Sequence, residues 1–305
     1  MVEPLAPRDP RRIGRYEILG RLGQGGMGVV YLGRSPAGRR VAIKTMREDL
    51  SADPALRARF AREIAAARRV SGAFTAGVED MDAEGEQLWL ATVYVDGPSL
   101  QELVVRHGPL PPEHVWTIGA QLVEALQGIH REGIVHRDLK PGNILMSSEG
   151  PKVIDFGIAS VAESAPVTTN SEIGGTLLYM APEAFSGVPL DAAADIFALG
   201  GVLVFAATGH PPFNQAEHPT ALIGAILTAE PQLYDVPAPL QPILAACLSR
   251  IGSSARVWTG CSQTSFSAGP GTTRCPPRGR AFRSPAPGLR TWDRGRRRNP
   301  LRSRR

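Results

Sequence analysis

The strongest constraint on the fold is an ordered set of short motifs in the middle of the chain. His136-Arg137-Asp138-Leu139-Lys140-Pro141-Gly142-Asn143 is followed by Asp155-Phe156-Gly157 and then by Ala181-Pro182-Glu183. Between the first two motifs, residues 144–154 predict a short β-hairpin that turns at residues 147–150. A hairpin returns the chain to where it started, so Asp155 is predicted to lie near Asn143.

These residue types together indicate phosphate chemistry. An aspartate beside an asparagine offers the hard oxygen ligands that Mg²⁺ prefers, and Mg²⁺ also binds substrate phosphates. Asp138 can then accept a hydrogen bond from an incoming hydroxyl group, and Lys140 can neutralise a moving phosphoryl group. Taken one at a time, Asp138, Asn143 and Asp155 would be ordinary turn residues. As one ordered set they favour phosphoryl transfer.

A glycine-rich turn, Gly23-Gln24-Gly25-Gly26-Met27-Gly28, separates predicted strands at residues 16–19 and 29–32. Glycines let backbone N–H groups approach phosphate oxygens, although such a turn is a weak signal alone. A dinucleotide-binding fold would need a helix directly after it, and here a strand follows.

Lys44 ends the predicted strand at residues 41–44 and is a candidate cation for phosphate oxygens. A buried lysine needs an anion, and Glu63 on a predicted helix at residues 54–70 is suitable. The alternatives are a solvated lysine and a Glu63 that pairs with Arg59 or Arg62.

The pattern of apolar residues predicts two lobes. Residues 16–95 read as a strand-rich small lobe with one helix, and residues 96–250 as a larger lobe with helices at 100–107, 113–131, 195–208 and 220–228. The apolar run at residues 196–209 is shorter than the ~18 residues of a membrane span, so it predicts a buried helix. Residues 1–15 form an extension without the apolar core of a signal peptide. Three cysteines favour a reducing compartment, and we expect a cytoplasmic protein.

The charge is divided unevenly along the chain. Residues 251–305 carry thirteen arginines and one acid, whereas residues 1–250 carry 21 basic and 28 acidic residues. The last segment is rich in Gly, Pro, Ser and Arg without apolar periodicity, so we expect a basic disordered tail.

The order of the motifs resembles that of the eukaryotic-type protein kinase superfamily. The phrases LGQGGMGVVYLG, HRDLKPGNIL and VIDFGIA are typical of its bacterial serine/threonine kinases, and the resemblance covers residues 13–249. It implies an α+β, bilobal fold, with a small antiparallel β lobe carrying one helix and a larger, mainly helical lobe. It also implies transfer of the ATP γ-phosphate to Ser and Thr hydroxyls of protein substrates, with ATP and Mg²⁺ as the cofactors.

The same resemblance implies roles for individual residues. Lys44 would bind the α- and β-phosphates and pair with Glu63, Asp138 would be the catalytic base, and Lys140 would contact the γ-phosphate. Asn143 and Asp155 would hold Mg²⁺. Val30 and Ala42 would enclose the adenine against Leu145. Thr92 would lie at the back of the adenine pocket. The full set implied to contact ATP is Leu22, Gly23, Gly25, Gly28, Val30, Ala42, Lys44, Val93, Val95 and Leu145.

Regulatory positions are implied by the resemblance in the same way. Arg137 would hold a phosphate on the loop at residues 158–179, whose acceptors would be Thr168, Thr169 and Ser171, and self-association would allow autophosphorylation in trans. Thr176 would favour a serine or threonine acceptor. Asp195 would brace the backbone of the catalytic loop. Glu183 would pair with an arginine.

The sequence departs from the family pattern after residue 248. The family continues with an arginine-containing loop and a last helix, neither of which is recognisable here, although Arg256 could pair with Glu183. We interpret residues 251–305 as the product of a frameshift or truncation. This leaves a nucleotide-binding pseudokinase or scaffold as an alternative function. Binding of nucleic acid through the tail is a weaker alternative, because the tail contains no recognisable nucleic-acid module. The physiological substrate, the activating signal and the oligomeric state stay open.

Overall fold

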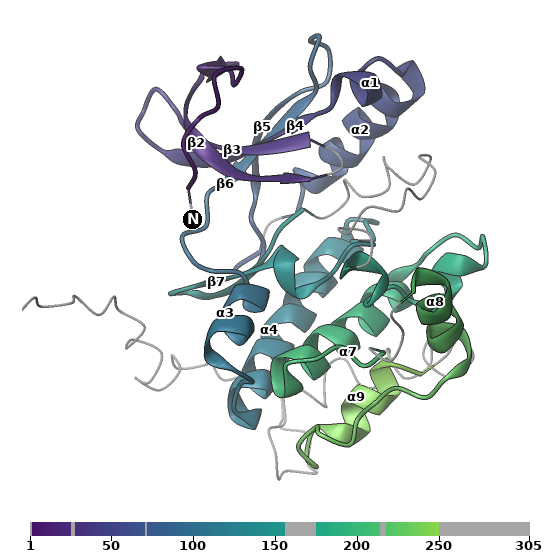
Figure 1. The fold of residues 1–305 in the computed structure, drawn as a ribbon. Coiled ribbons are helices and arrows are strands. Elements are labelled where there is room, and N and C mark those ends of the chain that lie inside the picture. Colours follow the sequence, from purple (N-terminus) through teal and green to yellow (C-terminus); the bar gives the residue numbers. More distant parts are fainter. Residues whose placement is uncertain (1, 26–27, 71, 156–174, 214–217, 250–305) are drawn as a thin grey trace, which may run out of the picture.

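A strand-rich lobe and a mainly helical lobe make up the computed structural model of the chain (Figure 1). The structure describes residues 2–25, 28–70, 72–155, 175–213 and 218–249. The N-terminal lobe holds one six-stranded antiparallel sheet, with the strands in the order β1-β2-β3-β4-β6-β5. Its strands are β1 (Arg12–Ile13), β2 (Tyr16–Gly25), β3 (Gly28–Arg34), β4 (Arg40–Met46), β5 (Val78–Asp82) and β6 (Trp89–Val93).

The helices of this lobe, α1 (Glu48–Ser51) and α2 (Pro54–Ala67), follow β4. Asp53 begins α2 by accepting a hydrogen bond from Ala55 N at 2.8 Å, which satisfies one of the amides that a helix start leaves unpaired. Phe60 and Ile64 lie one turn apart on α2 and belong to the same apolar cluster as Met46 and Leu90 of the sheet. This apolar stripe fixes the rotation of α2 about its axis.

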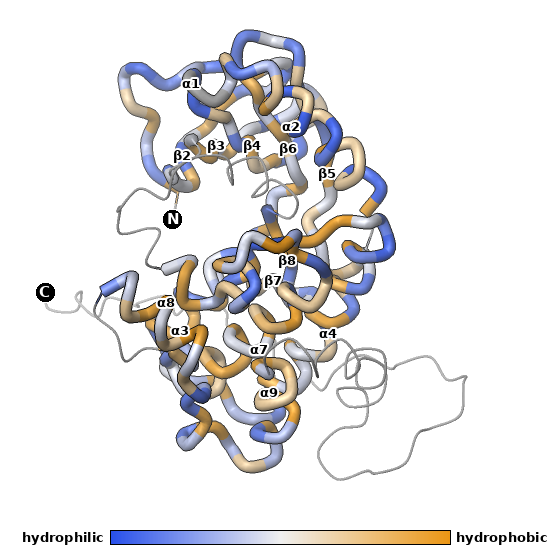
Figure 2. Tube along the Cα trace, turned by 90° about the vertical axis from the view of Figure 1, so that its right-hand side faces the viewer, coloured by the Kyte–Doolittle hydropathy of each residue, from blue (hydrophilic) through white to orange (hydrophobic). Residues whose placement is uncertain are grey.

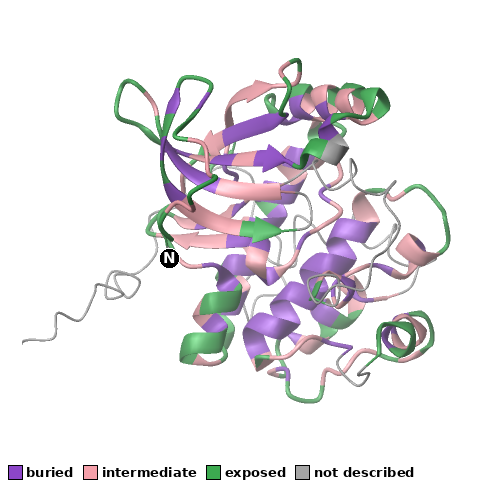
Figure 3. Ribbon diagram, turned by 45° about the horizontal axis from the view of Figure 1, so that its top comes forward, coloured by how far each residue is buried: buried purple, intermediate pink, exposed green. Residues whose placement is uncertain are grey.

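The C-terminal lobe is built around one buried helix, α7 (Ala192–Thr208), which is buried at every position from Ala194 to Ala207 (Figure 3). Apolar residues gather around it, as the orange segments of Figure 2 show. The other elements are α3 (Leu100–His107), α4 (Pro112–Arg131), η1 (Pro141–Asn143), β7 (Ile144–Ser147), β8 (Gly150–Val153), η2 (Pro182–Phe185), α8 (Pro219–Thr228) and α9 (Gln241–Cys247).

The bilobal α+β fold predicted from the sequence is confirmed. The predicted hairpin is present as β7 and β8, with Ser147 opposite Gly150, and the apolar run at residues 196–209 lies in the buried helix α7. Within the described ranges, no helix combines the length and the apolar character that a membrane crossing needs. The predicted basic tail at residues 251–305 lies outside the part of the chain that the structure describes.

Candidate active site

The loop at residues 136–143, which follows α4 and is called the catalytic loop below, is held by a single carboxylate from α7. Asp195 is 1% exposed and accepts hydrogen bonds from the backbone N–H of His136 at 2.8 Å and of Arg137 at 2.9 Å. His130, at the end of α4, contacts the same carboxylate through Nε2 at 2.6 Å. A buried carboxylate needs such donors. The role of Asp195 implied by the family resemblance therefore agrees with the observed contacts, whereas the contact of His130 was not predicted.

His136 fixes a second part of the loop. Its Nδ1 accepts from the backbone N–H of Asp138 at 3.3 Å, and its Nε2 lies 3.1 Å from the carbonyl oxygen of Ile154. A backbone N–H only donates and a carbonyl oxygen only accepts, so one neutral tautomer, protonated on Nε2, satisfies both contacts. The imidazole thereby ties the loop to the end of the β7–β8 hairpin.

Two residues of the site have left-handed backbones. Arg137 has φ of 68° and Asp155 has φ of 61°. Residues other than glycine adopt this conformation at a cost of about 1–3 kcal/mol, and such residues cluster at functional sites. At Arg137, the hydrogen bonds that Asp195 and His136 make with the loop offset this conformational cost.

Four predicted site residues converge at the end of this loop. Lys140 Nζ lies 2.9 Å from Asp138 Oδ2 and donates to Thr176 Oγ1 at 2.8 Å. Asn143 Nδ2 donates to the backbone oxygen of Asp138 at 2.7 Å and to its Oδ2 at 3.0 Å. The second carboxylate oxygen of Asp138, Oδ1, is buried and has no hydrogen-bond partner among the described residues. It is an acceptor for which the described residues provide no donor.

Lys44 reaches across from the N-terminal lobe to this group. Its Nζ lies 2.9 Å from Asp155 Oδ2. Burial alone would raise the pKa of Asp155, but the charge and hydrogen bond of Lys44 outweigh it and hold the pKa below the ordinary value of 3.8. Asp155 also lies beside Asn143, as the hairpin predicted, because Ile154 N donates to Asn143 O at 3.0 Å.

The predicted ion pair between Lys44 and Glu63 is wrong for this structure. Among the described residues, Lys44 pairs with Asp155, and Glu63 Oε1 lies 3.4 Å from Arg59 Nε one helical turn earlier. Arg59 and Glu63 lie four residues apart on α2, a spacing that places two side chains next to each other on one helix face. The alternative that paired Glu63 with Arg59 is the one observed.

The residues expected around ATP lie on the two strands that border the glycine-rich turn, on or just after the neighbouring strands β4 and β6, and on β7. Gly23 and Val30 face each other across β2 and β3, Val30 faces Lys44 across β3 and β4, and Ala42 faces Thr92 across β4 and β6. Gly28 has φ of 151°, and a Cβ there would lie 1.8 Å from Thr45 O, so no side chain fits. The remaining positions of this set lie on β2, at the end of β6 or just after it, and on β7; they are Leu22, Gly25, Val93, Val95 and Leu145.

The donor set fits Mg²⁺. The amide nitrogen of Asn143 is used within the loop, which leaves its carbonyl oxygen as an acceptor, and Asp155 contributes an ionised carboxylate. Oxygen atoms of these two kinds are the ligands that Mg²⁺ takes when it also binds phosphates. No group of three or more His, Cys, Asp or Glu side chains with metal-binding geometry occurs among the described residues.

Other predicted positions stand apart from this group. Glu183 is buried in η2 and its Oε2 has no partner within the described ranges. Burial, followed by the charge of Asp191, raises its pKa above 4.5. Phe156, Gly157, Thr168, Thr169, Ser171 and Arg256 lie outside the described residues.

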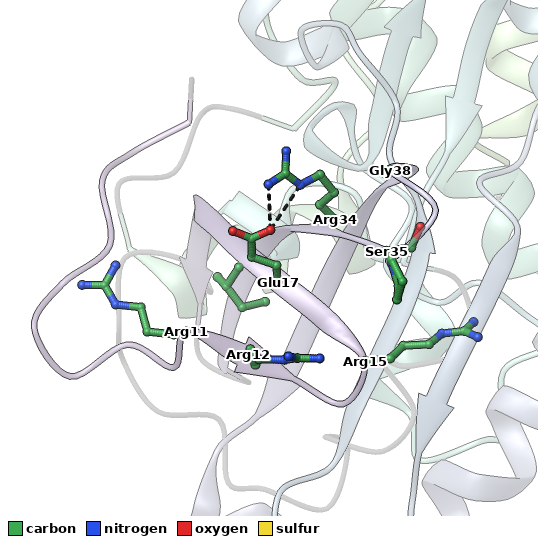
Figure 4. A pocket seen from close by; sticks show the side chains of 9 residues that line it. Arg11, Arg12, Arg15, Glu17, Arg34, Ser35 and Gly38 are labelled. Atoms are coloured by element: carbon green, nitrogen blue, oxygen red, sulfur yellow. Dashed lines mark hydrogen bonds and ion pairs between the residues drawn. The ribbon is translucent and has the colours of Figure 1, made fainter.

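A cavity of about 830 Å³ lies on the N-terminal lobe and contains none of the predicted site residues (Figure 4). Four of its nine lining residues are arginines, and Glu17 of β2 is the acidic one. Its location rules it out as the candidate active site, which is defined instead by the Lys44, Asp138 and Asp155 contacts.

A two-lobed fold with a lysine–aspartate pair between the lobes and an Asp-Lys-Asn catalytic loop defines a phosphotransferase of the protein kinase class. The family model for the protein kinase domain matches residues 16–251, and the chain belongs to this family.

Its relatives are bacterial serine/threonine protein kinases. The chain is 51% identical to the serine/threonine-protein kinase AfsK of Streptomyces coelicolor over 249 residues. This alignment covers 81% of this chain and 31% of AfsK. It is 47% identical over 247 residues to the probable serine/threonine-protein kinase PkwA of Thermomonospora curvata, covering 81% of this chain and 33% of PkwA. The crystal structure of the PknI kinase domain of Mycobacterium tuberculosis superposes with a TM-score of 0.62 at 28% identity, over 81% of this chain and 94% of that one. The chain spans about a third of the length of the two curated relatives.

Proposed function

We propose that this chain is an active serine/threonine protein kinase that transfers the γ-phosphate of ATP to Ser and Thr hydroxyls of proteins. The observation that carries the proposal is the buried Oδ1 of Asp138, which has no hydrogen-bond partner in the described part of the chain and lies beside the Lys140–Thr176 contact. A substrate hydroxyl can donate to this oxygen and pass its proton there as it attacks phosphorus.

The neighbouring residues account for the charge of the reaction. Lys140, 2.9 Å from Asp138, can balance charge on the transferred phosphoryl group. Lys44, held by Asp155, can bind phosphate oxygens on the side of the N-terminal lobe that faces Asp155. Mg²⁺ held by Asn143 and Asp155 would neutralise the phosphates of ATP.

We extend the proposal to regulation. Thr168, Thr169 and Ser171 are the proposed acceptors of autophosphorylation, and Arg137 is the proposed ligand of the resulting phosphate. Transfer between two copies would require transient self-association. The cytoplasm, which supplies ATP and a reducing environment, is the proposed location.

Replacement of Asp138 by Asn tests the function. Purified wild type and Asp138→Asn are incubated with Mg²⁺, γ-labelled ATP and a basic protein substrate, and ATP binding is measured in parallel. We expect the variant to lose roughly 10²–10⁴-fold in turnover, because the proton acceptor is gone. Its dissociation constant for ATP should stay near that of the wild type. Asp138 touches the predicted metal site only through Asn143 Nδ2, and an asparagine oxygen at position 138 can accept the same hydrogen bond, so Asn143 keeps its carbonyl oxygen for Mg²⁺.

The assay also separates the alternative. A wild type that binds ATP but transfers no phosphate would support the pseudokinase interpretation instead. An Asp138→Asn variant with full activity would contradict the assignment of the catalytic base.

A further inference from the structure

The first residues of the chain lie against the N-terminal lobe, beside the strand that leads into the glycine-rich turn. Glu3 and Arg21 exchange two backbone hydrogen bonds, from Glu3 N to Arg21 O at 2.8 Å and from Arg21 N to Glu3 O at 2.9 Å. Leu5 packs against the apolar cluster that contains Tyr31. The segment that the sequence presents as an extension is therefore part of the lobe.

Asp9 is the centre of this contact. Its side chain is 3% exposed, and its carboxylate accepts four hydrogen bonds. Arg21 donates through Nε at 2.6 Å and Nη2 at 2.5 Å, Tyr31 donates through its hydroxyl at 2.9 Å, and Ala6 donates through its backbone N–H at 2.6 Å. Arg21 makes the largest contribution to a pKa of about 2 for Asp9, so the carboxylate is ionised at neutral pH.

The position of this carboxylate matters because its partner Arg21 lies just before Gly23, the first residue of the glycine-rich turn. Arg21 also faces Tyr31 across the β2–β3 hairpin that carries this turn at its tip. The register of the hairpin is irregular between Arg21 and Gly23, so the strand ladder constrains the turn less there. Arg21 Nη1 also donates to Gln24 Oε1, inside the turn, at 3.2 Å. The Asp9 carboxylate thus contacts β2 through Arg21 and β3 through Tyr31, at the base of the turn.

We propose that Asp9 is a positioning residue for ATP, which fixes the glycine-rich turn over the phosphate site through Arg21 and Tyr31. The inference rests on the proposed function, because it names a further residue that serves the same site. Since the ion pair is mostly buried, salt screens it little. An ion pair that only stabilised the lobe would change the melting temperature and leave the affinity for ATP unaltered.

The same hairpin offers a matched control at its other end. Glu17 of β2 and Arg34 of β3 form an ion pair at 2.7 Å, with side chains 57% and 49% exposed (Figure 4). This pair joins the same two strands but lies away from the glycine-rich turn. Glu17→Gln therefore removes a carboxylate from the hairpin without removing the contact at the base of the turn.

The test compares the full-length wild type with Asp9→Asn, Glu17→Gln and the double variant Asp9→Asn/Arg21→Gln. We measure kcat, KM for ATP, KM for the protein substrate, the dissociation constant of Mg·ATP and the melting temperature. In Asp9→Asn we expect the KM and dissociation constant for ATP to rise roughly tenfold, because the phosphate-binding backbone is displaced. kcat and the KM for the protein should change little, and Glu17→Gln should match the wild type. The double variant should resemble the single one, because the two side chains act as a unit.

Several outcomes would overturn the inference. One is a folded Asp9→Asn variant with a lower melting temperature but an unchanged affinity for ATP, and another is an equal loss of affinity in Glu17→Gln. If Asp9→Asn does not fold, Tyr31→Phe removes one of the four hydrogen bonds and should weaken ATP binding in the same direction. Unaltered ATP affinity and unaltered amide hydrogen exchange at residues 20–25 in that variant would also refute the role.

The two proposals fail in different ways. A wild type without phosphotransfer contradicts the proposed function, and the dissociation constants for Mg·ATP then decide the role of Asp9. A wild type that binds no nucleotide contradicts both.

Discussion

Lys44 is one of only three lysines in the chain, against thirty-one arginines, and it is the cation that joins the two lobes at the site. We expect Lys44→Met to lower kcat/KM about 100-fold, because it removes the charge proposed to bind the phosphates of ATP. It also leaves Asp155 without the lysine that lowers its pKa. Steady-state kinetics with varied ATP measures the effect.

The third lysine provides the control for this prediction. Lys152 pairs at 3.0 Å with Glu149 and donates to the backbone oxygen of Ala73, and neither of these partners is a predicted site residue. Lys152→Met should therefore keep wild-type kinetics. Equal kinetics in both variants would show that Lys44 does not serve the site.

At the scale of single residues, the sequence predicts which residues belong to the site better than it predicts which residues they contact. The motif set predicted Asp138, Lys140, Asn143 and Asp155, and the structure brings them together at the lobe boundary. The motifs could not predict that Lys44 would pair with Asp155, because Glu63 and Asp155 are both candidate anions for Lys44 and the choice depends on tertiary structure. Asp9 carries no motif, and its role depends on an arginine twelve residues away.

At the scale of elements, α7 and α9 approach each other closely in the C-terminal lobe. A Cβ at Gly200 would lie 2.9 Å from Cys247 Cβ and 3.0 Å from Leu248 Cγ, well inside the normal separation of carbon atoms. Gly200→Ala should therefore force the helices apart and destabilise the protein by about 1–3 kcal/mol. The melting temperature from circular dichroism measures this loss.

Gly224 in α8 is the matched position, because a Cβ there meets no atom within 4 Å. Gly224→Ala should stabilise the protein by about 0.5–1 kcal/mol, since alanine loses less backbone entropy in a helix. A stabilising effect of both substitutions would contradict the predicted contact between α7 and α9.

Helices and strands with strong periodicity could be predicted from the sequence, and weaker ones could not. α4 and α7 have long apolar stripes, and the β7–β8 hairpin is marked by the polar turn at Ser147 to Gly150. β5 was missed because Val78–Asp82 alternates two apolar with three acidic residues, so it looks like a loop. Its place at the edge of the sheet, paired only with β6, is set by tertiary contacts.

At the scale of the whole molecule, two carboxylates, Asp9 in the N-terminal lobe and Glu183 in the C-terminal lobe, respond to acid in opposite ways. In the N-terminal lobe, Asp9 has a pKa of about 2, below its ordinary value of 3.8. The ionised form is thus favoured by folding, and the stability it contributes is present above about pH 4 and is lost as the pH falls towards 2. In the C-terminal lobe, burial raises the pKa of Glu183 above 4.5, so folding favours its protonated form.

A plot of melting temperature against pH should therefore have two limbs. As the pH falls from 7 towards 4.5, protonation of Glu183 relieves the cost of a buried charge and raises the melting temperature. Below pH 4, protonation of Asp9 breaks its ion pair with Arg21 and the melting temperature falls. Differential scanning fluorimetry between pH 7 and pH 2 on the wild type and Glu183→Gln checks both limbs. Because glutamine does not ionise, the variant should lose the first limb, melt at least as high as the wild type at pH 7, and keep the second. A first limb that survives in Glu183→Gln would assign the effect to another group.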